Sequence, residues 1–265
     1  HFIYFAELMY RAAPTAATLD KYAEYVAATA EFMYSFASYN KLHNRYELRG
    51  IIPAQETAAL RPAITYNPPF ELAYWHYGLE VAQRWRERCG HPRDARWDKL
   101  LTKLSPLAAV NGLYVAAESH PDSFEDIRNT SDHMAALGAL GVLPQCPLVD
   151  PGTMAATFDW VWKNWHWEKT WGWDFPMTAM TAARLGKRRE AVDALLLDQP
   201  ANTYLISGHN CRDQRLRVYL PGNGGLLTAV AMMCTGWNGA PEIPNPGFPQ
   251  DGSWNVRWEN LQTME

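Results

Sequence analysis

The stretch Trp171-Gly-Trp-Asp-Phe-Pro-Met-Thr-Ala-Met-Thr-Ala-Ala-Arg-Leu-Gly186 joins a tryptophan-rich opening to a run of small and apolar residues. The opening belongs to a loop, and the run that follows predicts a helix over Phe175–Leu185. Gly186 is a typical helix stop, and a second helix is predicted directly after it, over Arg188–Leu197. Because the link Gly186–Lys187 is so short, the two helices should form an antiparallel hairpin.

Helical periodicity continues outward from this hairpin in both directions, and no internal strand ladder is indicated. Gly112–Ala116 and Ser253–Trp258 could form short strands. The sequence is therefore typical of an all-α domain. It predicts nine helices, over Phe2–Arg11, Leu19–Ala37, Phe70–Arg88, Asp94–Leu107, Asp132–Leu140, Pro151–Trp165, Phe175–Leu185, Arg188–Leu197 and Gly224–Thr235.

The connections between these helices alternate between short and long. Successive antiparallel hairpins give this pattern when every long loop lies on the same face of the domain. Loops of such length in a compact domain are usually functional, so we expect the active face there. The short links are Ala12–Ala17, Cys89–Arg93, Leu143–Asp150 and Gly186–Lys187, and the long loops are Ser38–Pro69, Ala108–Ser131, His166–Asp174 and Asp198–Asn223.

The charge and the aromatic content of the chain limit the kinds of molecule that it is expected to bind. The net charge is -4, and Lys and Arg are scattered without a basic stripe, which argues against nucleic acid. No apolar run is long enough to span a membrane. The chain has 12 Trp, 13 Tyr and 9 Phe, which could fill a helical core or stack on sugar rings. Core packing explains least well the loop cluster Trp165, Trp167, Trp171 and Trp173.

The sequence lacks the motifs of several classes of enzyme. The four cysteines are widely spaced and the eight histidines are dispersed, which disfavours a metal site or a disulfide framework. Nucleotide-binding glycine motifs and the G-x-S-x-G elbow of serine hydrolases are missing as well. We therefore expect no metal and no cofactor.

Four segments resemble motifs of known glycosidases, and they occur in the same order. Trp171–Gly186 resembles a hairpin of the six-hairpin glycosidases that reads loosely GW…A-RLG. Gly138–Pro144, preceded by Ser131-Asp132-His133, resembles the SHL-x-GL-x-P element of glycoside hydrolase family 95, the α-L-fucosidases. Pro221–Met233 is similar to that family's DGNFG stretch, and Ile51–Glu56 to its SPE loop. Together the segments cover about two-thirds of the chain, and family 65 is similar as well.

This resemblance implies an (α/α)6 toroid of helical hairpins, with residues 1–239 as the toroid domain and 240–265 as an extended tail packed on it. Because a ring of six hairpins needs twelve helices, about three helices, and plausibly a β-sandwich, are expected upstream of His1. The implied activity is hydrolysis of a glycosidic bond, α-linked and with inversion, in an oligosaccharide or in a plant or host glycan. A periplasmic or secreted bacterial enzyme is expected rather than a cytoplasmic one.

Inverting hydrolysis needs a carboxylic acid that protonates the leaving oxygen and a base that activates water. By its place in the SPE-like loop, Glu56 is the predicted acid. The family's base falls where this chain has Pro221, so we take Asp174 as a substitute base. Its alternative role is to cap the following helix. Asp213 and Glu118 are lower-ranked candidates for the base.

Aromatic and polar residues of the same loops are predicted to bind the sugar. Trp171 and Trp173 would contact its ring faces. The polar candidates, each of which could instead stabilise a turn or a helix start, are His133, His209, Asn210, Asn223 and Asn67. Glu71 is assigned only a favourable charge at a helix N-terminus, and Trp75 a place in the core.

Three other readings remain open. A phosphorylase of the same fold would need a phosphate site, for which Arg212 and Arg215 are candidates. A polysaccharide lyase, or a related epimerase, could use His209, Arg212 and Tyr204 near an acidic sugar. A carbohydrate-binding relative without catalysis would be consistent with Pro221 at the position of the family's base.

Overall fold

The computed structural model describes residues 1–55 and 62–265. Six short strands pair as antiparallel hairpins: β1 (Ser38–Asn40) with β2 (Arg45–Glu47), β3 (Ala109–Val110) with β4 (Leu113–Tyr114), and β5 (Thr203–Tyr204) with β6 (Asn210–Cys211). The described residues are mainly α-helical, which confirms the predicted class. Their nine α-helices are α1 (Phe2–Ala12), α2 (Ala16–Phe36), α3 (Pro69–Arg88), α4 (Ala95–Lys103), α5 (Ala135–Gly138), α6 (Pro151–Asn164), α7 (Asp174–Arg184), α8 (Arg188–Leu195) and α9 (Leu220–Thr235).

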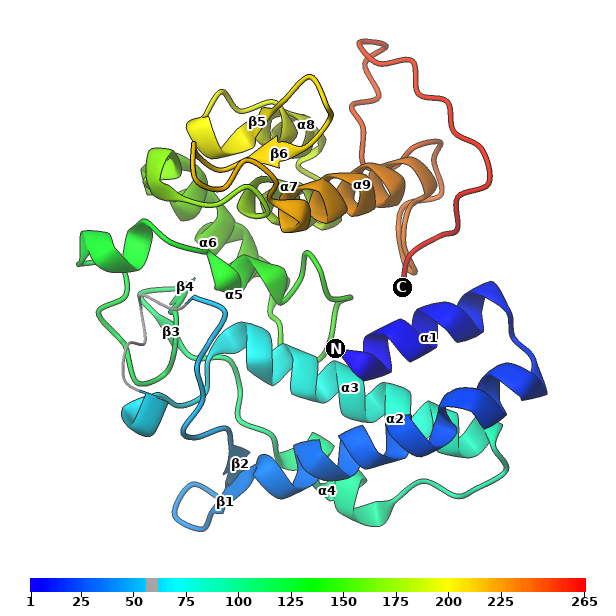
Figure 1. Cartoon of the computed structure of the whole chain (residues 1–265). Coiled ribbons are helices and arrows are strands. Elements are labelled where there is room, and N and C mark those ends of the chain that lie inside the picture. The colour runs from blue at the N-terminus through cyan, green and yellow to red at the C-terminus, as the bar shows by residue number, and fades with distance from the viewer. Residues whose placement is uncertain (56–61) are drawn as a thin grey trace.

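The helices lie in two groups, with α1–α4 in the lower half of the view and α5–α9 in the upper half (Figure 1). The odd-numbered helices α1, α3, α5, α7 and α9 contact one another in this order. Each even-numbered helix packs against at least one odd-numbered neighbour. In α7 every residue from Asp174 to Ala183 is buried, whereas α2 and α8 keep an exposed face. Helix α7 is therefore an inner helix, whereas α1 and α9 keep an exposed face as well.

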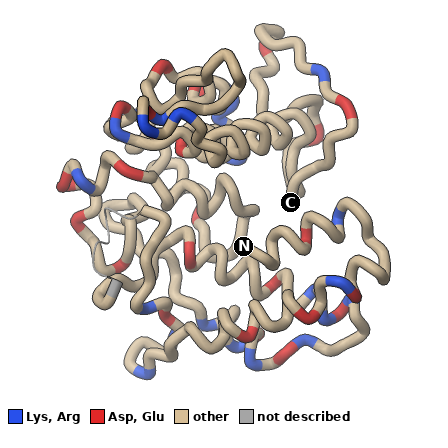
Figure 2. The backbone as a smooth tube through the Cα atoms, in the orientation of Figure 1, with Lys and Arg blue, Asp and Glu red and all other residues tan. Residues whose placement is uncertain are grey.

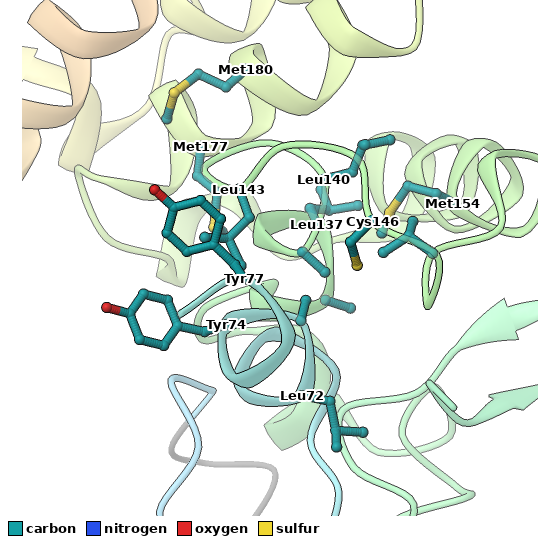
Figure 3. Packing of buried hydrophobic residues seen from close by; sticks show 14 of the residues in the cluster. Leu72, Tyr74, Tyr77, Leu137, Leu140, Leu143, Cys146, Met154, Met177 and Met180 are labelled. Atoms are coloured by element: carbon teal, nitrogen blue, oxygen red, sulfur yellow. The ribbon is translucent and has the colours of Figure 1, made fainter. Parts of the chain in front are cut away.

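Close packing joins α3, α5, α7 and α9 near the first turns of α3 and α7. A Cβ atom added to Gly138 of α5 would lie 3.0 Å from the Phe70 ring of α3 and 3.2 Å from the Met177 sulfur of α7. One added to Gly225 of α9 would lie 2.7 Å from Pro176 of α7. Figure 3 shows the core beside this junction, where Met177 and Leu143 lie close to Tyr77 of α3. The first turns of α3 and α7 thus lie close to the end of α5, and the first turn of α7 lies close to Gly225 of α9.

Two helices differ from their predicted limits for identifiable reasons. The helix expected over Asp132–Leu140 is reduced to α5, because the Asp132 carbonyl instead accepts hydrogen bonds from Trp165 Nε1 and Thr170 Oγ1. The helix expected from Gly224 begins earlier, at Leu220. Proline suits the first helical turn, and Pro221 lies there.

Residues 240–265 have no helix or strand in the structure, so the strand considered over Ser253–Trp258 is not formed. The segment runs past α9 and returns toward the centre of the molecule (Figure 1). At its end, Met264 pairs with Trp237, and the Glu265 carboxylate accepts a hydrogen bond from Tyr77 Oη of α3 at 2.9 Å.

Acidic and basic residues of the described chain are interspersed over the whole trace, without a long segment of one sign (Figure 2). None of the described helices combines the length and the apolar character that crossing a bilayer requires.

Candidate functional site

A histidine and a buried aspartate meet at the junction of α5 and α7. His133 precedes α5, and its Nδ1 lies 3.0 and 3.1 Å from the two carboxylate oxygens of Asp174. Because a carboxylate accepts, Nδ1 carries the hydrogen. The opposite ring nitrogen, Nε2, lies 3.7 Å from Asp132 Oδ1, which is longer than a hydrogen bond.

Asp174 is enclosed on all sides. Its side chain is 0% exposed, and its Oδ2 accepts hydrogen bonds from Thr170 Oγ1 and from the backbone N–H of Trp171 at 2.9 Å. Burial raises the pKa of Asp174, and the hydrogen bond from His133 opposes that rise. A carboxylate without contact to solvent is poorly placed to activate water. Its geometry instead suits it to hold the His133 ring in one orientation.

Aromatic side chains surround this pair. The His133 ring centre lies 4.6 Å from that of Trp173 and 5.9 Å from that of Trp171. Trp171 also contacts Tyr219, at 5.6 Å, and carries the Arg212 guanidinium over its ring at 4.9 Å. Burial raises the pKa of Tyr219, and the Asp174 charge adds to this effect. The two predicted sugar platforms therefore lie beside the predicted polar residue His133.

The loop before α9 is joined to the same region by two asparagines. Asn210 is fully buried, and its Nδ2 donates to the carbonyl groups of Ala201 and Thr203. Its Oδ1 fits against Gly172, where an added Cβ would lie 2.0 Å away. Asn223 accepts from the Asn210 backbone N–H at 2.9 Å and so ties α9 to this loop.

These contacts give both asparagines a structural role. Asn210 is enclosed and so cannot reach a sugar as predicted, whereas Asn223 is partly exposed and its sugar binding stays a prediction. His209 is partly exposed, and its Nδ1 lies 3.0 Å from Ser207 Oγ. No contact joins it to His133 among the described interactions.

Asn67 was predicted to bind substrate, but it lies inside the protein. It is 0% exposed, accepts from Leu48 N–H at 2.9 Å, and donates to Ser105 Oγ and Glu118 Oε2. Its φ of 53° is a left-handed conformation that asparagine tolerates. Asn67 therefore organises the chain before α3 and has no contact left for a sugar. The Glu118 carboxylate accepts the hydrogen bond from Asn67 and another, at 2.6 Å, from Arg45 Nη2.

The predicted acid Glu56 lies outside the described residues. Another acidic residue, Glu71, lies in the first turn of α3 and lines a cavity of about 420 Å3. Its Oε1 accepts from the Ala54 backbone N–H at 2.6 Å. Its Oε2 is buried and has no hydrogen-bond partner among the described residues. Burial raises the pKa of Glu71 to about 7.

Most of the remaining cavity wall is apolar, with His1 and Thr29 as polar exceptions. Phe32 comes from α2, Phe70, Tyr74 and Trp75 come from α3, and residues 52–54 close one side. The hydroxyl of Tyr74 is also buried without a partner among the described residues. Sequence reasoning missed this site, although a carboxyl group among three aromatic residues in Phe70-Glu-Leu-Ala-Tyr-Trp75 was a usable signal.

No group of three His, Cys, Asp or Glu side chains that could hold a metal occurs in the described ranges. The cysteines there are free thiols. In comparisons with known proteins, no protein-family model matches the chain and no curated protein is significantly similar to it.

Proposed function

We propose that this chain is the catalytic part of a glycoside hydrolase, and that its helical hairpins belong to an (α/α) toroid. The successive contacts of the odd-numbered helices, with even-numbered helices packed against them, support this arrangement of hairpins. The resemblance of four segments to six-hairpin glycosidases supports the same fold, and it extends to the loops that carry His133 and Trp171.

One observation carries the proposal: His133, oriented by Asp174, has its ring centre 4.6 Å from that of Trp173 and 5.9 Å from that of Trp171. Flat aromatic groups offer the contact surface that a sugar ring needs. A histidine held by a buried carboxylate is a group that can transfer protons near neutral pH. Together with an acid that protonates the leaving oxygen, these two features would support cleavage of a glycosidic bond.

We assign the base function to His133 and Asp132 together, and an orienting function to Asp174. In the reaction, water attacks the anomeric carbon and gives its proton to this pair. The bond from that carbon to the glycosidic oxygen breaks, and the departing oxygen keeps the bonding electrons and takes a proton from the acid. Glu56 remains the candidate for this acid from the resemblance.

The proposal is tested by measuring free sugar released from a panel of aryl glycosides, with and without phosphate. We expect release without phosphate, and a loss of at least a hundredfold in turnover for His133→Ala. Asp193→Asn, an exposed position on α8, is the control and should retain full activity. Release that depends on phosphate would replace the hydrolase with a phosphorylase. Full activity of His133→Ala would exclude the assigned site.

A further inference from the structure

We propose that the cavity beside Glu71 is a second sugar-binding position, which takes an uncharged pyranose ring and hydrogen-bonds its hydroxyls through Glu71 and Tyr74. The choice of a sugar rests on the proposed function. The position itself rests on the cavity and on two buried polar atoms of side chains that line it, and its lining shares no residue with the groups around His133.

The first argument is the pair of polar atoms without partners. Buried polar atoms in folded proteins are nearly always hydrogen-bonded, so an exception calls for an absent partner. Five buried side-chain atoms of the described residues lack one, and two of them, Glu71 Oε2 and Tyr74 Oη, belong to side chains that line this cavity. A sugar hydroxyl both donates and accepts, so neighbouring hydroxyls of one ring could satisfy both atoms after small side-chain adjustments.

The second argument is the shape and chemistry of the walls. The volume of about 420 Å3 is within the range of small-molecule sites, about 300–1,000 Å3. Phe32, Phe70 and Trp75 supply aromatic surface for the apolar faces of a ring. An aromatic site with a few hydrogen-bonding groups is the combination that binds sugars.

The third argument concerns charge. The titratable groups of the described cavity wall are Glu71, Tyr74 and His1. Burial raises the pKa of Glu71 to about 7 and that of Tyr74 to about 12. The shift of Glu71 disfavours negative charge in the cavity near neutral pH, which suits a neutral ligand. The uncharged carboxyl of Glu71 can also donate a hydrogen bond, which its ionised form cannot.

Two substitutions at Glu71 distinguish its donation of a hydrogen bond from the ionisation of its carboxyl group. In Glu71→Gln the amide still donates a hydrogen bond, so binding should be retained. In Glu71→Leu the donor is lost, and binding should weaken about tenfold, as expected for one hydrogen bond to a ligand. Between pH 6 and pH 8 the native protein should lose affinity as Glu71 ionises, whereas Glu71→Gln should not.

Binding is measured by saturation-transfer NMR titration of the full chain with methyl α-D-glucopyranoside, methyl α-D-mannopyranoside and methyl α-L-fucopyranoside. Phe32→Ala removes one wall without opening the core, because this side chain is 59% exposed. Phe5→Ala is the matched control, since Phe5 is 60% exposed on α1 and does not line the cavity. We expect at least one glycoside to bind, about tenfold more weakly to Phe32→Ala and unchanged to Phe5→Ala.

The inference is overturned if none of the three glycosides binds the native protein at pH 6, or if both Phe32→Ala and Glu71→Leu bind like the native protein. Its failure is distinguishable from failure of the proposed function. Glycoside binding that Phe32→Ala and Glu71→Leu leave unchanged, in a protein that hydrolyses glycosides, would remove this position and keep the enzyme. Glycoside binding at this cavity without any turnover would keep the position and remove the enzyme.

Discussion

The unusual environment of Glu71 should make the stability of this protein depend on pH in a way that one substitution removes. In the unfolded chain its carboxyl ionises near pH 4.5, whereas burial in the folded protein raises the pKa to about 7. The folded state therefore holds its proton more tightly than the unfolded state does. Stability contributed by the neutral acid is fully present below pH 4.5 and is lost as the pH rises through 7.

The size of this effect follows from the two pKa values. They differ by about 2.5, and each pH unit between them corresponds to 1.36 kcal/mol, so the native protein should lose about 3 kcal/mol between pH 4 and pH 8 from this group. Glutamine cannot ionise. The free energy of unfolding of Glu71→Gln, relative to the native protein, should therefore rise by about 3 kcal/mol over the same range.

Urea unfolding at pH 4, 5, 6, 7 and 8 measures this quantity for both proteins. Any fixed cost of burying the amide cancels, because only the change with pH is compared. Glu190→Gln, also in the first turn of a helix but outside the cavity, measures the contribution of a helix N-terminus. A difference that stays constant within about 1 kcal/mol from pH 4 to pH 8 would refute the reasoning.

Three further predictions concern the enclosed residues. Gly172→Ala should destabilise the fold by about 1–3 kcal/mol in urea unfolding, because a Cβ there would lie 2.0 Å from Asn210 Oδ1. Gly224→Ala, with nothing within 4 Å, should be neutral or stabilising, and equal losses for both would contradict the packing argument. Asn67→Ala should lower the free energy of unfolding by about 2–4 kcal/mol, because its buried hydrogen bonds are lost. Glycoside turnover per folded molecule should be retained. Reduced turnover at saturating substrate would show that Asn67 belongs to the site after all. Asp174→Asn should reduce turnover at least tenfold by releasing His133, and unchanged turnover would exclude its orienting role.

Local sequence signals predicted the helices well and their ends less well. Apolar periodicity and glycine stops are properties of neighbouring residues, so the α7–α8 hairpin around Gly186 could be recognised directly. The end of a helix also depends on distant partners. The segment before α5 leaves the helix because the Asp132 carbonyl bonds to Trp165 and Thr170, more than thirty positions away.

The candidate site was only partly accessible to the same reasoning. Grouping Trp171, Trp173 and Asp174 required no more than their closeness in sequence, and the resemblance added His133. Which polar residue faces outward could not be predicted. Asn67 and Asp174 are polar residues in loop-rich segments, and they are enclosed because groups from other parts of the chain satisfy them.

The sequence by itself determined the helical class, the hairpin connections and the chemical types in the connecting loops, because each depends on short-range pattern and composition. The tertiary structure decided which of those groups are buried, which are paired and which line a cavity. Glu71 shows the reason: its charge depends on the water removed by α2, α3 and residues 52–54 together. Desolvation is a property of the packed assembly and cannot be read from any one segment.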